Sequence, residues 1–370
     1  MVSFIFEKAQ NQFNQQLPFV LYRKPKEQLL KGIFQRDDLL HTVGDFTEKG
    51  FVLAPFDDTE KPTLIKPDEM VKEPIEEWNL NAVTKNPSIS NNEEEKKGFE
   101  SLVEKAIEVI RKKELEKVVV SRKKEVQVAI SAIHIFKKLV YTYNNALCYV
   151  WYHPKVGVWL GATPEILVKT VGTSFTTMSL AGTQVFDENI VNPEWGKKEL
   201  HEQQLVTDYI EQVLQGKTKA LKIGDQESTR AGKLWHLRTK ISGNFERDGL
   251  GKLIRSLHPT PAVCGIPKKN AKDFILKNEN YNRLFYTGFL GELNFKQEQS
   301  RNINLKNKEN SAYKSVLTRT ELYVNLRCMQ LNKGLATLYV GGGITWGSEP
   351  QKEWEETENK SETILKVLSD

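Results

Sequence analysis

The feature that most constrains the fold lies near the C-terminus, where an apolar segment leads through three glycines towards a helix start. Residues 338–340 form a strand-like apolar run, and the glycines at 341–343 let the backbone approach another group closely. Ser348 is followed two residues later by Pro350, a pattern typical of a helix N-cap and an early helical position. The sequence therefore predicts a strand, a tight turn and a helix in succession.

The predicted C-terminal helix carries three charged residues on one side. Glu353, Glu356 and Lys360 fall at positions i, i+3 and i+7 and therefore share one face. Such a face could hold a hard divalent cation beside an anionic ligand. The same charges would also complement the macrodipole of a solvated helix without any function. A phosphate-binding loop is disfavoured, because no lysine and hydroxyl residue follow the last glycine.

Composition places the chain among ordinary globular proteins. With 370 residues, 39% of them hydrophobic, the chain can bury a large core in one big domain or two smaller ones. The net charge of +5 is mild and its Lys and Arg residues are spread along the chain, so a small anionic substrate suits it at least as well as nucleic acid. No concentrated basic stretch with stacking aromatics is present in the sequence, and we expect no nucleic-acid partner.

The cysteines and apolar runs indicate the compartment. Cys148, Cys264 and Cys328 lie in apolar surroundings without CxxC spacing, which favours buried thiols in a reducing compartment and disfavours a thiolate metal site. The longest apolar run, residues 146–152, is too short to span a bilayer, and the N-terminus lacks a signal-like pattern. We therefore expect a cytoplasmic protein without a membrane partner.

Apolar patterning predicts alternating strands and helices along the first half of the chain. Strands are expected at residues 19–22 and 51–54, followed by a polar surface connection at 72–97 that would suit a boundary between two lobes. Apolar residues at helical spacing predict an amphipathic helix over 92–113 that lies on a sheet. The predicted elements that follow are a strand at 117–128, a helix at 131–141, a hairpin from 146–152 and 156–161, and further strands to residue 184.

A second Glu-x-x-Glu pair lies on the helix predicted at residues 193–214. Glu199 and Glu202 interrupt a stripe that Val206, Tyr209 and Val213 otherwise make apolar. Carboxylates on a core-facing stripe are costly to desolvate unless they are paired or bind a metal. Two such helices would suit Mg²⁺, which binds through a few carboxylates, waters and substrate oxygens. Pairing with Lys197, Lys198 or other basic residues at the helix edge explains the two carboxylates equally well.

Several short motifs, taken together, resemble the chorismate-utilising enzymes. The family includes isochorismate synthases, salicylate synthases, anthranilate synthase component I and aminodeoxychorismate synthases. The matching motifs follow one another from about residue 99 to the C-terminus: 117–122 (KVVVSR), 161–165 (GATPE), 180–183 (LAGT), 198–202 (KELHE), 234–237 (LWHL), 258–265 (HPTPAVCG), 286–291 (YTGFLG), 327–328 (RC) and 341–360.

The resemblance implies an α+β fold. In this family two large antiparallel β-sheets pack together with helices outside, and the active site lies deep between the sheets. Residues 99–370 would form the chorismate-binding catalytic region, whereas residues 1–98 match weakly and would be the N-terminal part of the same fold. The segment 294–320 is longer and more polar than in relatives, and we expect it to be a surface loop.

The resemblance also implies a role for each matching site residue. Glu202 and Glu356 would bind Mg²⁺, with Glu199 and Glu353 in flanking positions. His236 would lie beside the reacting ring, although a core histidine between Trp235 and Leu237 is the alternative. Arg327 and Lys360 would bind substrate carboxylates. Further residues would line the pocket: Gly182, Thr183, Ala262, Val263 and Gly341.

Two positions bear on the reaction. In the family, water or ammonia attacks C2 of the chorismate ring as the C4 hydroxyl leaves, so the site needs a base and an acid. Lys117 and Glu165 match these roles, although Lys117 could instead be an edge-strand lysine that prevents aggregation. Ammonia-using members carry glutamine where this chain has Lys117, and aminodeoxychorismate synthases carry a nucleophilic lysine where it has Ala181. The resemblance therefore implies that water is the nucleophile.

The expected function is a Mg²⁺-dependent isochorismate synthase, an isomerase. The nearest rival is a salicylate synthase, which eliminates pyruvate from isochorismate in the same pocket. A non-catalytic chorismate-binding protein is the alternative from another class. The isochorismate could serve menaquinone or siderophore biosynthesis, and we expect a monomer or a weak homo-oligomer.

Overall fold

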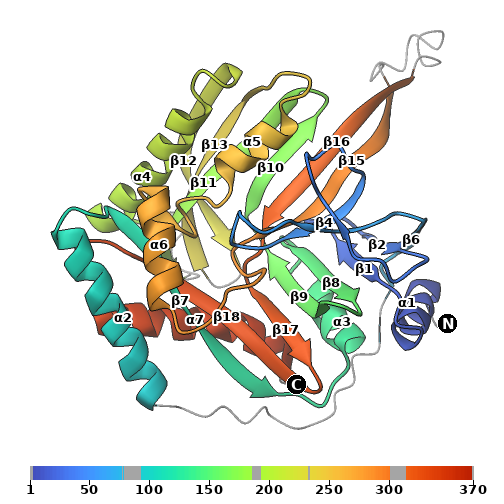
Figure 1. Ribbon diagram of the computed structural model, residues 1–370, viewed down its shortest axis with the longest axis horizontal. Coiled ribbons are helices and arrows are strands. Elements are labelled where there is room, and N and C mark those ends of the chain that lie inside the picture. Colours follow the sequence, from blue (N-terminus) through green and yellow to red (C-terminus); the bar gives the residue numbers. More distant parts are fainter. Residues whose placement is uncertain are drawn as a thin grey trace.

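Two antiparallel nine-stranded sheets form the framework of the protein (Figure 1). The structure, a computed structural model, describes residues 3–76, 78, 93–185, 193–231, 234–300 and 314–368. In spatial order the first sheet contains β14 (Gly265–Ile266), β7 (Lys117–Gln127), β18 (Leu335–Ile344), β17 (Cys328–Asn332), β9 (Gly157–Thr163), β8 (Leu147–His153), β1 (Phe19–Arg23), β2 (Leu29–Phe34) and β6 (Glu69–Pro74). The second contains β12 (Lys219–Ala231), β13 (Leu234–Asn244), β11 (Ser174–Val185), β10 (Ile166–Val171), β16 (Lys314–Val324), β15 (Phe289–Ser300), β4 (Gly50–Ala54), β5 (Thr63–Ile65) and β3 (His41–Thr42).

Helices cover the outer faces of both sheets (Figure 1). The helices are α1 (Phe4–Asn14), α2 (Glu93–Arg111), α3 (Ala132–Thr142), α4 (Lys197–Leu214), α5 (Leu250–Leu257), α6 (Lys268–Asn278) and α7 (Pro350–Leu368). On the first sheet, α2 and α6 contact β7, α7 contacts β18, α3 contacts β8 and β9, and α1 contacts β1 and β2. On the second sheet, α4 contacts β11 and β13, and it also contacts α5. The predicted α+β fold with two packed antiparallel sheets is confirmed.

The sequence of β8 shows why the sheets pack in this way. Successive side chains of a strand point to opposite faces, and every residue of β8 is buried. Leu147, Tyr149 and Trp151 join the core between the sheets, together with Phe51 and Tyr323 of the second sheet. The alternate residues pack instead in the core beneath the helices, with residues of α3: Cys148, Val150 and Tyr152. A continuous apolar run is therefore required, because both faces of this strand are covered.

The N-terminal residues supply strands to both sheets. β1 pairs with β8 in the first sheet, and β4 pairs with β15 in the second. Polar segment 72–97, predicted as a surface connection, begins within β6 and ends within α2, and most of the residues between them lie outside the described part. The strands predicted at 19–22 and 51–54 are present. The domain boundary at residue 98 stays a prediction.

The prediction of a surface loop at 294–320 is wrong for the residues that the structure describes. Residues 294–300 belong to β15 and residues 314–320 to β16, and the two strands pair in one long hairpin. A shift of register between Glu292 and Phe295 marks a bulge in this hairpin. The distal end projects away from the sheets in Figure 1, so its pairing comes from backbone hydrogen bonds and its side chains can be polar. Residues 301–313 lie outside the described part.

The C-terminal strand is longer than its apolar residues predict. Gly341, Gly342 and Gly343 lie inside β18 and pair with Ser121, Val120 and Val119 of β7, and the turn follows them. The prediction that Ser348 caps the helix is wrong. Its Oγ accepts a hydrogen bond from the backbone N–H of Thr345 (3.1 Å) and closes the turn, while the Glu349 carbonyl accepts the first helical bond, from Glu353. Pro350 is the first helical residue.

The remaining local predictions agree closely with the structure. The helices and strands predicted between 92 and 161 are present as α2, β7, α3, β8 and β9, with ends that differ by a few residues. α4 starts at Lys197, four residues later than predicted, because Gly196 at its N-cap is extended. The three cysteines are buried and free, as predicted. No helix in the described ranges combines the length and the apolar character needed to cross a bilayer.

Candidate active site

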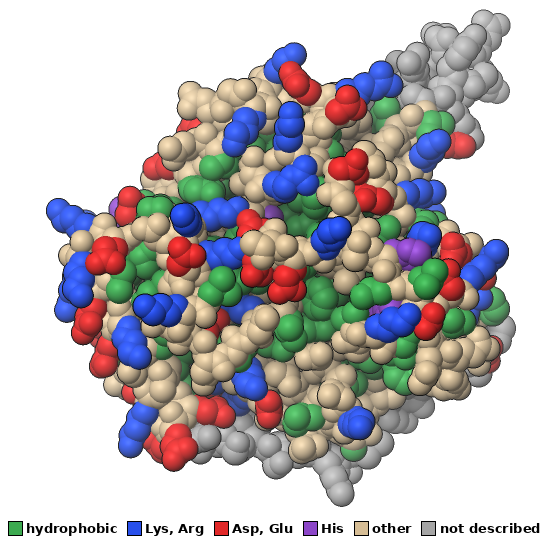
Figure 2. All heavy atoms as spheres, in the orientation of Figure 1, with side chains coloured by type: hydrophobic (Ala, Val, Ile, Leu, Met, Phe, Trp, Pro, Cys, Tyr) green, Lys and Arg blue, Asp and Glu red, His purple; other side chains and the backbone are tan. Residues whose placement is uncertain are grey.

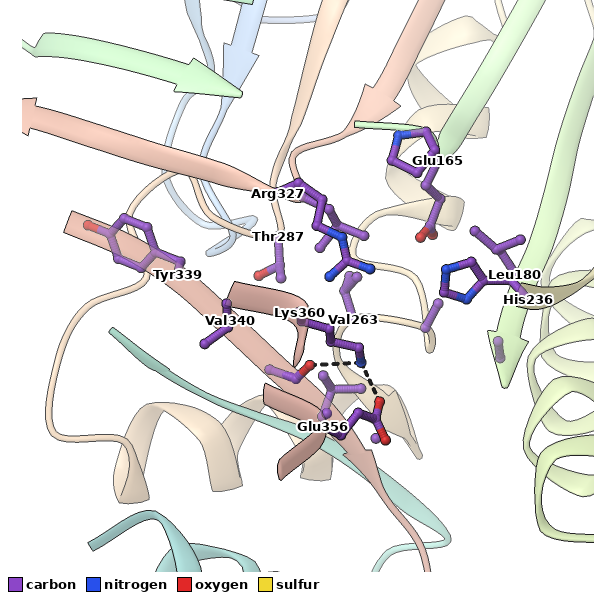
Figure 3. Close-up of a pocket in the computed structure, with 18 of the residues that line it drawn as sticks. Glu165, Leu180, His236, Val263, Thr287, Arg327, Tyr339, Val340, Glu356 and Lys360 are labelled. Atoms are coloured by element: carbon purple, nitrogen blue, oxygen red, sulfur yellow. Dashed lines mark hydrogen bonds and ion pairs between the residues drawn. The ribbon is translucent and has the colours of Figure 1, made fainter. Parts of the chain in front are cut away.

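A cavity opens where β7 and β18 of the first sheet meet β11 and β13 of the second. Short links at 164–165, 262–263, 286–287 and 326–327 complete its wall together with α4 and α7. We call it the central cavity (Figure 3). Most of the predicted site residues line it, although they are spread over almost 200 positions of the sequence: Glu165, Gly182, Glu202, His236, Ala262, Val263, Arg327, Gly341, Glu356 and Lys360.

Lys117 lies behind the wall of the central cavity. Its side chain is 0% exposed, and its Nζ donates to Oε1 of Glu202 at 2.8 Å. The glycine at 343 makes room for this ion pair, because a Cβ there would lie 2.6 Å from Glu202 Oε1 and 3.0 Å from Lys117 Cε. Lys117 pairs with Ile266 of β14, so its burial excludes the alternative of a solvated lysine at a bare sheet edge.

Glu165 occupies the link between β9 and β10, and its carboxyl group points into the central cavity (Figure 3). The residue is 4% exposed. Burial raises the pKa of this carboxyl to about 7, even though the charges of Lys117, Arg327 and Lys360 act in the opposite direction. A substantial fraction of Glu165 therefore carries a proton near neutral pH and can donate it.

His236 projects from β13 towards the same space (Figure 3). Its Nδ1 lies 3.1 Å from the carbonyl oxygen of Gly182. Because a carbonyl can only accept, this hydrogen bond places the ring proton on Nδ1. Burial, together with the charges of Arg327 and Lys360, lowers the pKa of His236 to about 3, so the ring is neutral at pH 7. The neutral ring therefore lines the central cavity.

Gly182 shapes this part of the wall. Its φ is +74°, and the register of β11 against β13 shifts at this residue. A Cβ at this position would lie 3.2 Å from Cβ of Glu199, so glycine also allows α4 to approach the strand. Thr183 follows in β11, and its side chain is outside the described part.

Two cations face the central cavity. Arg327 lies in the link between β16 and β17, and its guanidinium points into the cavity (Figure 3). No hydrogen bond or ion pair to this guanidinium is found among the described residues. Lys360 of α7 is held by Oε1 of Glu356 at 2.5 Å and by the carbonyl of Gly341 at 3.1 Å. The arrangement favours a ligand with more than one negative charge.

Each carboxylate proposed for a metal is held by a lysine, except Glu199. Glu202 of α4 pairs with Lys117, and the two α7 carboxylates pair with Lys198 and Lys360, at 2.9 Å for Glu353 and 2.5 Å for Glu356. Lys198 therefore does not pair with Glu199 or Glu202. Glu199 lies outside the central cavity, and its carboxylate folds back towards Gly196, where a Cβ would be 2.5 Å from Oε2.

The donor set suits a hard cation such as Mg²⁺. Glu353 is 1% exposed, and its Oε2 is buried without a hydrogen-bond partner among the described residues. Burial and then the neighbouring Glu356 raise the pKa of Glu353, while Lys198 and the Ser348 side chain act in the opposite direction. In the present side-chain positions no three His, Cys, Asp or Glu residues of the described ranges converge on one point. A metal would therefore have to draw carboxylates away from their lysines.

Arg283 is a structural residue of the site that the sequence did not reveal. It is 2% exposed and donates to the carbonyl oxygens of Val119 (2.7 Å) and Val263 (3.0 Å) and to Oγ1 of Thr287 (3.3 Å). All three partners line the central cavity. Glu279 balances its charge, and the i,i+4 spacing of this pair is the only local signal. Arg283 thus ties three parts of the cavity wall together.

Comparison with known proteins gives the same family. A sequence model described as "Chorismate binding enzyme" matches residues 59–300, and a second with that description matches residues 312–366. The isochorismate synthase MenF of Escherichia coli is 29% identical over 283 residues, 74% of this chain and 61% of that protein. The isochorismate synthase DhbC of Bacillus subtilis is 29% identical over 219 residues, 56% of this chain and 50% of that protein. The chain thus spans between half and two thirds of the length of these curated relatives.

Solved structures share the fold. The menaquinone-specific isochorismate synthase MenF from Escherichia coli superimposes with a TM-score of 0.75 at 21% identity, covering 95% of this chain and 89% of that one. Anthranilate synthase component I from Streptococcus pneumoniae gives 0.63 at 17% identity, covering 94% and 92%. Since the first sequence model alone matches well over half of the residues, the chain belongs to the family of chorismate-binding enzymes.

Proposed function

We propose that this protein is a Mg²⁺-dependent isochorismate synthase. One observation carries the proposal. Glu165, a buried acid with a pKa near 7, shares the central cavity with Glu202, which holds the buried amine of Lys117. The names of the curated relatives support the same reaction. Relatives named for menaquinone and for 2,3-dihydroxybenzoate both match, so the proposal stops at isochorismate.

Chorismate carries two carboxylates, and the cavity offers two cations. Arg327 has no competing ion pair among the described residues, and a guanidinium can bind a carboxylate through two parallel hydrogen bonds. Lys360 also lines the cavity and is already fixed by Glu356 and the Gly341 carbonyl. We assign these two residues to substrate binding, with Gly182, Ala262, Val263 and Gly341 as the wall against which the ring rests.

The reaction moves a hydroxyl group from C4 to C2. Water forms a bond to C2, the ring double bonds shift, and the C4–O bond breaks. Lys117 would accept the proton that water loses, and Glu165 would donate a proton to the leaving hydroxyl. One water enters and one leaves, so the net change is an isomerisation. His236, neutral with its proton on Nδ1, can only accept a hydrogen bond through Nε2 and would orient the ring.

Magnesium would be held by Glu202 and Glu356, with Glu353 beside them. When bound, it would neutralise the negative charge of a substrate carboxylate. The unpartnered Oε2 of Glu353 supports this assignment, because a buried carboxylate oxygen without a donor is costly. Glu199 would take part only after a change of side-chain conformation.

The product mixture tests the proposal. Purified protein would be incubated with chorismate and Mg²⁺ and without an ammonia donor, and every product would be identified. We expect isochorismate to accumulate to equilibrium with chorismate, without stoichiometric pyruvate. Lys117→Ala should lower turnover by about a hundredfold or more, while Lys112→Ala, an exposed lysine nearby, should behave as wild type.

Other products would contradict the proposal in distinct ways. Release of pyruvate with salicylate would identify the rival salicylate synthase. Tight chorismate binding without turnover would identify a non-catalytic binding protein. A Lys117→Ala variant within a few-fold of wild type would remove lysine from the mechanism.

A further inference from the structure

A second cavity lies against the central cavity, on the other side of Arg327. It is bounded by the end of α3 and the link to β8, by the end of β9, by α7 and by Arg230 of β12. Arg327 and Pro164 line both cavities. The two spaces are therefore neighbours with a shared guanidinium, and the proposed reaction uses only the first.

The rim of the second cavity is fixed by a buried arginine. Arg23 of β1 is 1% exposed, and its guanidinium donates to the Asn144 carbonyl (2.7 Å), to Oδ1 of Asn144 (2.9 Å) and to the carbonyl of Tyr143. These bonds hold the link between α3 and β8 from below. A rim that is already ordered loses little entropy when a ligand binds, which is a property of a preformed site.

The walls of the second cavity specify the chemistry of its ligand. Leu139, Ala146, Ala162 and Ile364 supply apolar surface suited to a ring or short hydrocarbon. Arg327, which also lines the central cavity, and the exposed Arg230 both line this second cavity. Two arginines beside apolar surface favour a carboxylate on an apolar body.

Tyr143 lines the second cavity, and its hydroxyl donates to the carbonyl of Thr363, another lining residue. Burial raises the pKa of Tyr143 to about 12, and the charge of Arg327 acts in the opposite direction. The positive charge of Arg327 therefore acts on Tyr143 in the second cavity as well as on Glu165 in the central one. The side chain of Arg327 is therefore part of both cavities.

We propose that the second cavity is a binding site for small ring carboxylates, and that its ligand competes with the ligand of the central cavity for Arg327. The site itself does not depend on the reaction assigned above. Its effect on turnover does rest on the proposed function, because an occupied second cavity would withdraw Arg327 from chorismate. A ring carboxylate bound there would then inhibit the enzyme by competing with the substrate for Arg327.

Direct binding tests the site independently of any activity. Benzoate would be titrated into the protein by calorimetry at constant ionic strength, with benzamide as the uncharged analogue and acetate as the carboxylate without a ring. We expect benzoate to bind and both analogues to bind much more weakly. Arg230→Gln should weaken benzoate binding by about two- to fivefold, the range expected for an exposed charge. Lys222→Gln, which removes an exposed charge from the same strand outside the cavity, should leave it unchanged.

Three results would overturn the site: no benzoate binding, equal binding of benzamide, or wild-type benzoate affinity in Arg230→Gln. The last of these would place benzoate in the central cavity instead. Kinetics test the sharing of Arg327. Benzoate should raise KM for chorismate without lowering kcat, and less so in Arg230→Gln, whose own KM and kcat should equal those of wild type. A fall in kcat at constant KM would show that the two ligands do not share Arg327.

Discussion

Single side chains in the central cavity owe their protonation states to burial. Glu165 is driven towards its neutral acid and His236 towards its neutral base, although both lie near the same cations. Desolvation disfavours the charged form of either group, so it raises the pKa of the acid Glu165 and lowers the pKa of the base His236. The cavity therefore holds a proton donor and a neutral hydrogen-bonding ring at the same pH.

The pKa of Glu165 predicts the pH dependence of the forward reaction. Proton donation needs the acid form, so kcat/KM should fall as the pH rises through about 7. Glu165→Gln should lose about a hundred- to ten-thousandfold in rate and should also lose this limb of the profile. Steady-state rates between pH 5 and 9 measure both effects. An unchanged limb in the residual activity of the variant would assign the titration to another group.

Glu165 should also make stability depend on pH. Its folded pKa lies above the unfolded value of 4.5, so its favourable contribution is complete below pH 4.5 and is lost as the pH rises through about 7. The loss is worth up to about 3 kcal/mol, at 1.36 kcal/mol per unit. Relative to wild type, Glu165→Gln should therefore gain stability between pH 5 and pH 8 in denaturant unfolding. The exposed carboxyl variant Glu104→Gln should show no such gain, and a parallel response of the two variants would contradict the assignment.

The glycines of strand β18 matter because they have no side chain. Its glycines pair with β7 as ordinary strand residues, yet they leave space above the sheet for charged groups from other elements. At Gly343 that space is filled by the pair of Lys117 and Glu202, and at Gly342 by the carboxylate of Glu353. The strand thereby lets α4 and α7 bring their carboxylates close to the sheet.

Gly343→Ala should separate the ion pair without unfolding the protein. The new Cβ would meet Glu202 Oε1 at 2.6 Å, and this flexible end can move away at small cost in stability. Turnover should fall by about tenfold or more, since misplaced catalytic groups are costly, while the melting temperature changes little. Gly347→Ala is the control, because a Cβ there meets nothing within 4 Å. Wild-type turnover in Gly343→Ala would show that catalysis does not need this contact.

At the scale of the whole molecule, the site exists because two sheets and two helices meet. Lys117 and Glu202 are 85 positions apart, and Lys198 and Glu353 are 155 apart. On the face seen in Figure 2, Lys and Arg side chains are interspersed with Asp and Glu. The positive groups that matter for an anionic substrate are those inside the central cavity.

Metal binding should stabilise the folded protein. A ligand that binds only the folded state adds about 2.7 kcal/mol at one hundred times its Kd, so Mg²⁺ should raise the melting temperature and chelator should reverse the rise. Glu202→Gln and Glu356→Gln should abolish this shift, whereas Glu355→Gln, on the exposed face of α7, should retain it. The measurement needs no substrate. An equal shift in all four proteins would place the metal elsewhere.

The sequence alone determined what depends on local periodicity and on motifs. Apolar residues at a spacing of three to four predict a helix where one face is buried, and a continuous apolar run predicts a buried strand, and so α2, α3 and β8 were predictable. The motif set identified the family, and with it the two sheets and most of the cavity residues. Two local predictions failed where the pattern misleads: the polar hairpin of β15 and β16, and the role of Ser348.

Only the tertiary structure decided which charges meet. The sequence offered Lys198 as a partner for its helical neighbours, but the fold gives it to Glu353 and gives Lys117 to Glu202. It also turned Glu199 away from the cavity and placed the proton of His236 on Nδ1 through the carbonyl of Gly182. Such pairings depend on distances of a few ångströms between segments that are remote in sequence. The local sequence pattern does not determine those distances, because they are set by how the sheets and helices pack.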